Sequence, residues 1–287
     1  MVLAVAAPVR AQQVIFTYEQ TLYEGKGPLK APEGIACTER GYLVVGDTGN
    51  RRLLLFNVRE GRVSGGEEIV LPQLTQPVRV QVDSRGNILA LDGKLHRVVR
   101  IASNGSFEKV IEPTGMPGLS NVVVGAFKVD AKDTVWLLDI AGRRVLMVDA
   151  SGAFAGEVPL PKESVAIMDL ALDVGGNLYA IDAVAGTIWI ADKGGSGFRS
   201  LATGLKDKLN FPTGITVSRG RLFIVDRHGN GVVVFGVDGS YMGRQLAVGW
   251  TNGLVNYPGQ LCLTDSGAAY LADTLNNRVQ VFSTGTK

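Results

Sequence analysis

Histidine and cysteine, two residue types that often serve in catalysis and metal binding, are scarce in this sequence of 287 residues. There are two histidines, His96 and His228, and two cysteines, Cys37 and Cys262. The sequence contains no Gly-x-Ser-x-Gly nucleophile elbow, no Gly-x-x-x-x-Gly-Lys phosphate loop and no Cys-x-x-Cys pair. Any chemistry therefore depends on which elements bring isolated residues together.

Six segments of the chain repeat, and in each of them a turn residue precedes an aspartate by six positions. The intervals between successive aspartates are 45, 47, 43, 44 and 47 residues, a spread so narrow that it identifies six repeats. The aspartates are Asp47, Asp92, Asp139, Asp182, Asp226 and Asp273.

Each repeat contains short apolar runs, rich in Val, Ile and aromatic residues and bounded by turn residues. Such runs are typical of strands rather than helices. Four antiparallel strands per repeat, at a period near 45 residues, predict an all-β fold, a six-bladed β-propeller of four-stranded blades. The runs are continuously apolar because the blades of a propeller are buried on both faces.

The two ends of the chain are predicted to close the ring. The last repeat has room for three strands only, whereas residues 13 to 23 form a strand-like segment with no other partner. We expect this N-terminal strand to complete the sixth blade and so remove the edges that an open sheet exposes. Residues 12 to 287 then form one propeller domain, and residues 1 to 11, with an apolar run at 2 to 7, are predicted to be a signal-peptide remnant.

The composition excludes several classes of protein. Lys and Arg number 29 against 27 Asp and Glu, so a net charge of +2 creates no global field for nucleic acid or an acidic membrane. No stretch approaches the ~18 apolar residues that a membrane-spanning helix needs. Glycine accounts for 37 of 287 residues, about 13% against the usual ~7%. These glycines recur before the second strand and after the third, where they turn the chain.

In four repeats an arginine follows the aspartate by five positions, across the turn between the second and third strands. Residues that flank a tight turn face each other, so each pair is expected to form and to satisfy backbone groups of the turn. The predicted pairs are Asp47 with Arg52, Asp92 with Arg97, Asp139 with Arg144, and Asp273 with Arg278.

These turns, with the Pro-Glu-Gly-Ile-Ala segment at 32 to 36 and Pro-Thr-Gly-Ile-Thr at 212 to 216, resemble the NHL repeat over residues 29 to 282. The resemblance implies a six-bladed propeller, in agreement with the count of repeats. It leaves function open, because NHL-like propellers include protein-interaction modules, extracellular sensor domains, RNA-binding domains and a few lyases. Function must therefore be argued from sites.

The innermost strands should place two rings of residues around the central channel. Alignment on the repeat aspartates gives a first ring of Glu33, Val78, Gly125, Met168, Thr213 and Gly259. The second ring is Gly34, Arg79, Ala126, Asp169, Gly214 and Gln260. The charged members, Glu33, Arg79 and Asp169, are the candidate residues of the channel mouth.

Neither ring gathers the carboxylates or imidazoles that would hold calcium or zinc. Of the Glu, Asn and Asp metal set of gluconolactonase-like propellers, only Glu33 has a counterpart here. His96 and His228 lie in turns three blades apart and are expected to be exposed, whereas a zinc-dependent amidating lyase of NHL type uses several histidines. The sequence thus predicts no metal site, no cofactor and no catalytic residue.

Cys37 and Cys262 lie in the inner strands of the first and last repeats, which become neighbours when the ring closes. Their alignment places them on opposite faces of their blades, so they either face each other and form a disulfide or point away from each other. Of these alternatives we expect two buried free thiols.

The turns between second and third strands share one face of a propeller with the connections between blades, and this face is mildly basic. It is either a solvated rim or a docking surface for an acidic partner. The candidate binding residues are Arg51, Lys94, His96, Arg143, Arg227, His228 and Asn277.

The leading hypothesis is a noncatalytic scaffold, a monomer that is periplasmic or extracellular and binds a protein partner on this face. The alternative is a metal-assisted propeller enzyme of the lyase or lactonase type. A third hypothesis is an RNA-binding NHL domain, although these turns carry no aromatic residues on which bases would stack, and a secreted protein meets little RNA.

Overall fold

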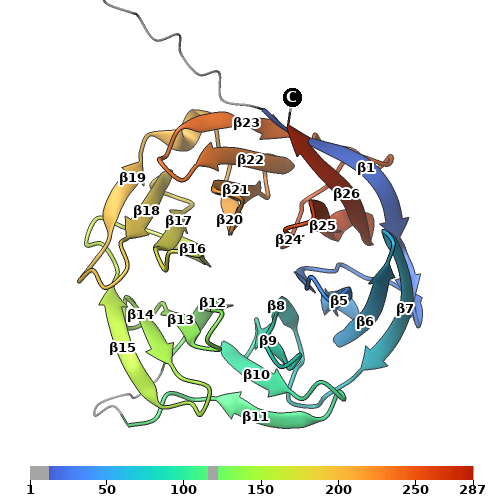
Figure 1. Ribbon diagram of the computed structural model, residues 1–287, viewed down its shortest axis with the longest axis horizontal. Coiled ribbons are helices and arrows are strands. Elements are labelled where there is room, and N and C mark those ends of the chain that lie inside the picture. Colours follow the sequence, from blue (N-terminus) through green and yellow to red (C-terminus); the bar gives the residue numbers. More distant parts are fainter. Residues whose placement is uncertain (1–12, 116–121, 287) are drawn as a thin grey trace, which may run out of the picture.

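The computed structural model describes residues 13 to 115 and 122 to 286. In it the six repeats form six four-stranded antiparallel sheets around a central channel (Figure 1). This confirms the predicted six-bladed β-propeller. The predicted signal-peptide remnant, residues 1 to 11, lies outside the described residues.

Each blade runs from an innermost strand at the channel to an outermost strand at the rim. Blade 1 comprises β4 (Gly34–Cys37), β5 (Tyr42–Asp47), β6 (Arg52–Arg59) and β7 (Arg62–Ile69). Blade 2 comprises β8 (Pro77–Val82), β9 (Ile88–Asp92), β10 (Arg97–Ile101) and β11 (Phe107–Ile111). Blade 3 comprises β12 (Val124–Val129), β13 (Val135–Asp139), β14 (Arg144–Val148) and β15 (Phe154–Pro159).

The second half of the ring repeats this order. Blade 4 comprises β16 (Ile167–Leu172), β17 (Leu178–Asp182), β18 (Thr187–Ala191) and β19 (Arg199–Ala202). Blade 5 comprises β20 (Pro212–Ser218), β21 (Arg221–Asp226), β22 (Gly231–Gly236) and β23 (Tyr241–Gln245). Blade 6 comprises β24 (Leu261–Leu263), β25 (Ala268–Asp273), β26 (Arg278–Thr286) and β1 (Val14–Leu22).

The N-terminal strand closes the ring as predicted. β1 pairs antiparallel with β26, from Val14 opposite Thr286 to Leu22 opposite Val279, and Figure 1 shows the two strands side by side. β26 is longer than expected, because its pairing with β1 continues past Phe282 as far as Thr286. A small hairpin follows β1, formed by β2 (Glu24–Gly25) and β3 (Gly27–Pro28).

The hydrophobic core is divided among the six interfaces between neighbouring blades. Each interface has its own cluster of buried residues, such as Leu53 of blade 1 with Val80 of blade 2, or Leu271 of blade 6 with Val234 of blade 5. Burial of one such side chain contributes about 1.5–3 kcal/mol. The middle strands supply both of their faces to these interfaces, which accounts for their continuous apolar runs.

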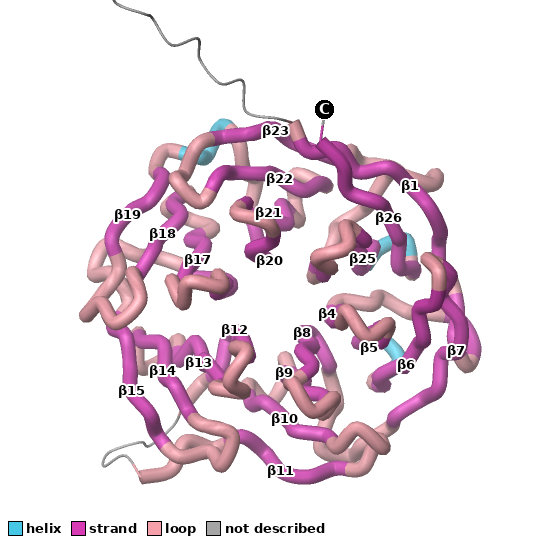
Figure 2. The backbone as a smooth tube through the Cα atoms, viewed as in Figure 1, coloured by secondary structure: helices cyan, strands magenta, loops and turns pink. Residues whose placement is uncertain are grey.

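Helix among the described residues is confined to three 3-10 turns, η1 (Thr48–Asn50), η2 (Leu205–Asp207) and η3 (Thr274–Asn276), drawn in cyan in Figure 2. Within the same residues no helix has the length and apolar character that crossing a bilayer requires.

The repeat aspartates end the second strand of every blade and are almost completely buried. Three of the predicted ion pairs are present: Arg52 with Asp47 at 2.7 Å, Arg144 with Asp139 at 3.1 Å, and Arg278 with Asp273 at 2.6 Å.

The fourth predicted pair, Asp92 with Arg97, does not form. The Asp92 carboxylate instead accepts hydrogen bonds from the backbone N–H groups of Thr75 and Leu95 and from the Thr75 hydroxyl. Burial opposes ionisation, yet these bonds hold the pKa of Asp92 below its ordinary value. Arg97 donates to the carbonyl of Gln73 instead.

The expectation of free thiols is wrong. Cys37 and Cys262 form a disulfide between the innermost strands of blades 1 and 6, with their Cα atoms 5.8 Å apart. Of the two orientations left open by the sequence, the cysteines adopt the one in which they face each other. The disulfide therefore joins the same two blades that ring closure makes neighbours.

Candidate active site

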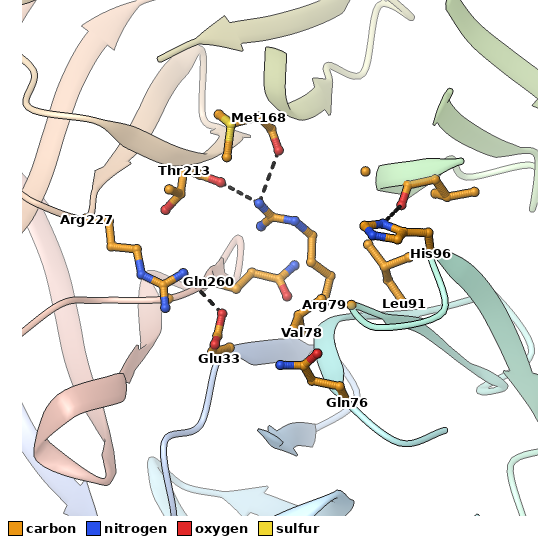
Figure 3. Close-up of a pocket in the computed structure, with 14 residues that line it drawn as sticks. Glu33, Gln76, Val78, Arg79, Leu91, His96, Met168, Thr213, Arg227 and Gln260 are labelled. Atoms are coloured by element: carbon orange, nitrogen blue, oxygen red, sulfur yellow. Dashed lines mark hydrogen bonds and ion pairs between the residues drawn. The ribbon is translucent and has the colours of Figure 1, made fainter. Parts of the chain in front are cut away.

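A cavity of about 320 Å³ lies at the mouth of the channel, where the innermost strands begin (Figure 3). We call it the mouth pocket. All six residues of the predicted first ring line it, together with Arg79 and Gln260 of the second ring. Of the remaining lining residues, Leu91 and Val124 lie in β9 and β12, and turns and connections supply Gln76, Gly93, His96 and Arg227.

The floor of the mouth pocket is the guanidinium group of Arg79, which reaches across the channel from blade 2. Its Nη2 donates to the backbone carbonyls of Met168 and Thr213, in blades 4 and 5. Its Nη1 lies 3.6 Å from the Asp169 carboxylate below. One side chain thus joins three blades and brings a positive charge to the centre of the pocket.

A second guanidinium group, that of Arg227, lies at the side of the pocket. Its Nη1 donates to Glu33 Oε2 at 3.1 Å, and the group lies over the Tyr257 ring, 4.4 Å from the ring centroid. Both contacts fix the orientation of the guanidinium plane. Figure 3 shows this ion pair on the side of the pocket opposite His96.

The imidazole of His96 faces the pocket from the turn between β9 and β10 (Figure 3). Its Nδ1 lies 3.3 Å from the carbonyl oxygen of Val124, in blade 3. Because a carbonyl only accepts, Nδ1 carries the proton, and in the neutral ring Nε2 bears a lone pair. His96 is therefore an oriented proton acceptor in a pocket that two guanidinium groups also line.

The turn geometry explains why several candidate binding residues stand where they do. In every blade the fourth residue after the repeat aspartate has left-handed backbone, with φ between 49° and 63°. These residues are Arg51, His96, Arg143, Gly186, Asn230 and Asn277. The left-handed conformation at this position forms the turn in every blade. Of the six residues, only His96 also lines the mouth pocket.

The other predicted binding residues are not gathered with His96 and Arg227. Arg51 and Lys94 are exposed. Arg143 Nη2 donates to the carbonyls of Pro161 and Ser164 and so fixes a connection between blades. The Asn277 amide oxygen accepts from the backbone N–H of Ala31.

His228 is exposed, as expected, but it belongs to an aromatic stack that the sequence did not suggest. Its ring lies between those of Phe211 and Tyr257, with centroids 4.9 and 5.2 Å away. Its Nε2 is 3.0 Å from the Tyr257 hydroxyl. Phe211 and Tyr257 come from connections between blades, outside the repeated turn. Each stands directly before a proline, and their spacing of 46 residues follows the period of the repeats.

The carboxylates near the channel are committed to cations. Glu33 is paired with Arg227, and Asp169 lies between Arg79 and Lys128, whose ammonium is 3.7 Å away. No group of three His, Cys, Asp or Glu side chains within residues 13–115 and 122–286 is placed to hold a metal ion. These residues do not fit the metal set of a gluconolactonase-like propeller.

No protein-family model and no curated protein matches this sequence. Solved structures match its fold. A streptogramin B lyase has a TM-score of 0.67 at 14% identity, covering 96% of this chain and 98% of that one. A putative gluconolactonase has a TM-score of 0.66 at 15% identity, covering 96% and 93%. The PQQ-bound aldose sugar dehydrogenase of Streptomyces coelicolor has a TM-score of 0.67 at 14% identity, covering 97% and 100%.

These similarities establish the propeller fold, and the NHL assignment has no matching family behind it. They also correct the expectation of a noncatalytic interaction scaffold. The three structures named above are a lyase, a putative lactonase and a dehydrogenase, so this chain shares its fold with enzymes, and at 14–15% identity the similarity shows the fold alone.

Proposed function

We propose that this protein is an enzyme of the lyase or lactonase type whose reaction takes place in the mouth pocket. The observation that carries the proposal is the oriented imidazole of His96, with Nδ1 bound to the Val124 carbonyl, in a pocket floored by the Arg79 guanidinium. The similarity in fold to a streptogramin B lyase and a putative gluconolactonase supports it. The proposal does not include a metal, because the described residues place no three His, Cys, Asp or Glu side chains together to hold one.

The proposed substrate is a lactone or other ester. His96 Nε2 accepts a proton from one of two places. In elimination, the proton comes from a carbon that lies between a carbonyl group and the carbon bearing the ester oxygen, so that this C–O bond breaks and the ester leaves as a carboxylate. In hydrolysis, the proton comes from a water that attacks the ester carbonyl, and the imidazolium returns it to the alcohol oxygen as the acyl C–O bond breaks. Negative charge develops on the oxygen of the activating carbonyl in the first reaction and on that of the ester carbonyl in the second. The guanidinium groups of Arg227 and Arg79 are already oriented and stabilise that charge.

The reaction class is tested with a panel of lactones and cyclic depsipeptides in water enriched in oxygen-18. Hydrolysis adds one labelled oxygen to the product, whereas elimination opens the ring without incorporating water. Ring opening of any panel member by either route supports the proposal. No turnover of the whole panel by folded protein would count against it.

The role of His96 is tested by His96→Asn, which keeps a side-chain donor for the Val124 carbonyl but has no proton acceptor at the place of Nε2. Loss of a general base should lower kcat by about 10²- to 10⁴-fold. His228→Asn is the matched control, because His228 does not line the mouth pocket, and its kcat should stay within a few-fold of wild type. Equal losses in the two variants would remove His96 from the mechanism.

We also propose that the chain is an NHL-type propeller, a monomer of the periplasm or the extracellular space. The Cys37–Cys262 disulfide supports such a location, because disulfides persist in oxidising compartments. Trapping thiols with an alkylating mass tag in fractionated cells should find both cysteines protected in the envelope or secreted fraction. Alkylated cysteines in a cytoplasmic pool would contradict this location.

A further inference from the structure

A second cavity, of about 170 Å³, lies at the other end of the channel, where the innermost strands end. We call it the base cavity. Its lining consists of apolar residues, the two cysteines of the disulfide, and four polar residues from different blades: Gln81, Lys128, Thr216 and Gln260. Arg79, the floor of the mouth pocket, does not line the base cavity. Gln260 is the one residue that lines both cavities.

Between the two cavities the buried charges do not balance. Arg79 of β8 and Lys128 of β12 both face one carboxylate, that of Asp169 on β16, at 3.6 and 3.7 Å. The same Asp169 oxygen accepts the backbone N–H of Ile215 at 3.0 Å. Asp169 is 1% exposed and Lys128 is 9% exposed. Two cations therefore share one anion in a region almost closed to bulk water.

The two cations differ in how their charge is compensated. Arg79 donates to two backbone carbonyls besides its contact with Asp169. The Lys128 ammonium reaches Asp169 only at 3.7 Å, longer than a good hydrogen bond. Burial lowers the pKa of Lys128, and Asp169 offsets this only in part. A buried ammonium with such weak compensation is stabilised strongly by an anion in contact with it.

The base cavity is large enough to hold such an anion. Lys128 lines the cavity, whereas Asp169 does not. The hydroxyl of Thr216 and the amide of Gln81 add neutral donors to the lining. The volume suits an ion of a few atoms, since one water occupies about 30 Å³ of the liquid.

We propose that the base cavity binds a small monovalent anion, a halide or a carboxylate the size of formate, through the ammonium of Lys128. The site is independent of the mouth pocket reaction and would be filled whether or not that pocket is catalytic. It balances the second cation at the centre of the propeller.

The test uses thermal unfolding of the full chain at constant ionic strength, with sodium sulfate replaced stepwise by sodium bromide or sodium formate. The Tm of wild type should rise with the monovalent anion and then level off, as binding to one site requires. Lys128→Met should lose this saturable rise. Lys132→Met, at an exposed lysine in the turn after the same strand, should keep it. A response of Lys128→Met equal to that of wild type overturns the proposal.

Wild-type crystals give a readout that needs no variant. Crystals equilibrated with bromide should show an anomalous peak beside Nζ of Lys128, and crystals in formate should show planar density there. Bromide alone identifies a halide site, and formate alone identifies a carboxylate site. A base cavity that holds neither ion under saturating conditions overturns the proposal.

Discussion

At the scale of single residues, the repeat aspartates occupy one position of the repeat, but their buried carboxylates are compensated by different partners. Asp273 accepts hydrogen bonds from the side chains of Arg278 and Gln280. Asp226, whose repeat lacks the arginine, forms an ion pair with Arg244 from the fourth strand of its blade. Each carboxylate is buried and must be compensated. The spacing in the sequence predicts the partner only when it lies directly across the turn.

Because of this difference, two arginines at equivalent positions, Arg278 and Arg97, should contribute unequally to the free energy of unfolding. Arg278 is 1% exposed and pairs with Asp273, so Arg278→Met leaves a buried carboxylate without its charge partner and should cost about 3 kcal/mol or more. Arg97→Met should cost about 1 kcal/mol, because Asp92 keeps all of its hydrogen bonds. Urea unfolding of both variants measures the difference. Similar losses would mean that the ion pair is not what stabilises this turn.

The sequence predicted the ring of the mouth pocket residue by residue, because equal spacing in equal blades places equivalent residues at equal heights along the channel. It did not predict the orientation of His96. The tautomer of that imidazole depends on the Val124 carbonyl, 28 residues away in the next blade. A contact between blades that occurs once in the ring has no periodic signal.

At the scale of elements, β1 joins the N-terminal end of the ring to the last blade. It pairs with β26 from Val14 to Leu22, with one irregularity between Tyr18 and Gln20, while the opposite edge of β26 pairs with β25. Val14 and Leu22 are buried, and Phe16 packs edge-on against Phe223 of blade 5 and Phe282 of β26. The strand therefore completes blade 6 and also covers the side of blade 5.

Deletion of residues 1 to 23 should lower the Tm by well over 10 °C and promote aggregation. The deletion removes one of four strands from blade 6 and exposes the unpaired backbone of β26 to other molecules. Deletion of residues 1 to 11 is the control, because it leaves β1 whole. Differential scanning calorimetry and light scattering measure the two effects. If both truncated proteins melt like the full chain, β1 does not hold the ring closed.

At the scale of the whole molecule, two different bonds close the ring at the same place. The rim is joined by the β1 and β26 pairing, and the channel side is joined by the disulfide between β4 and β24. The sequence placed both cysteines in neighbouring inner strands but could not orient them. Their direction depends on how blade 6 is rotated against blade 1, and the closed structure alone determines this.

The disulfide links residues 225 positions apart, so it restricts the unfolded chain strongly, and its reduction should cost about 2–5 kcal/mol. The check is urea unfolding with and without a phosphine reductant, after mass spectrometry has confirmed the gain of two hydrogens. The Cys37→Ser, Cys262→Ser double variant should be insensitive to the reductant and match the reduced wild type.

Because β1 and the disulfide close the same ring, removing β1 from the reduced protein should cost more than the two separate losses combined. Strict additivity would mean that each bond stabilises only its own blade and that the ring has no shared closure.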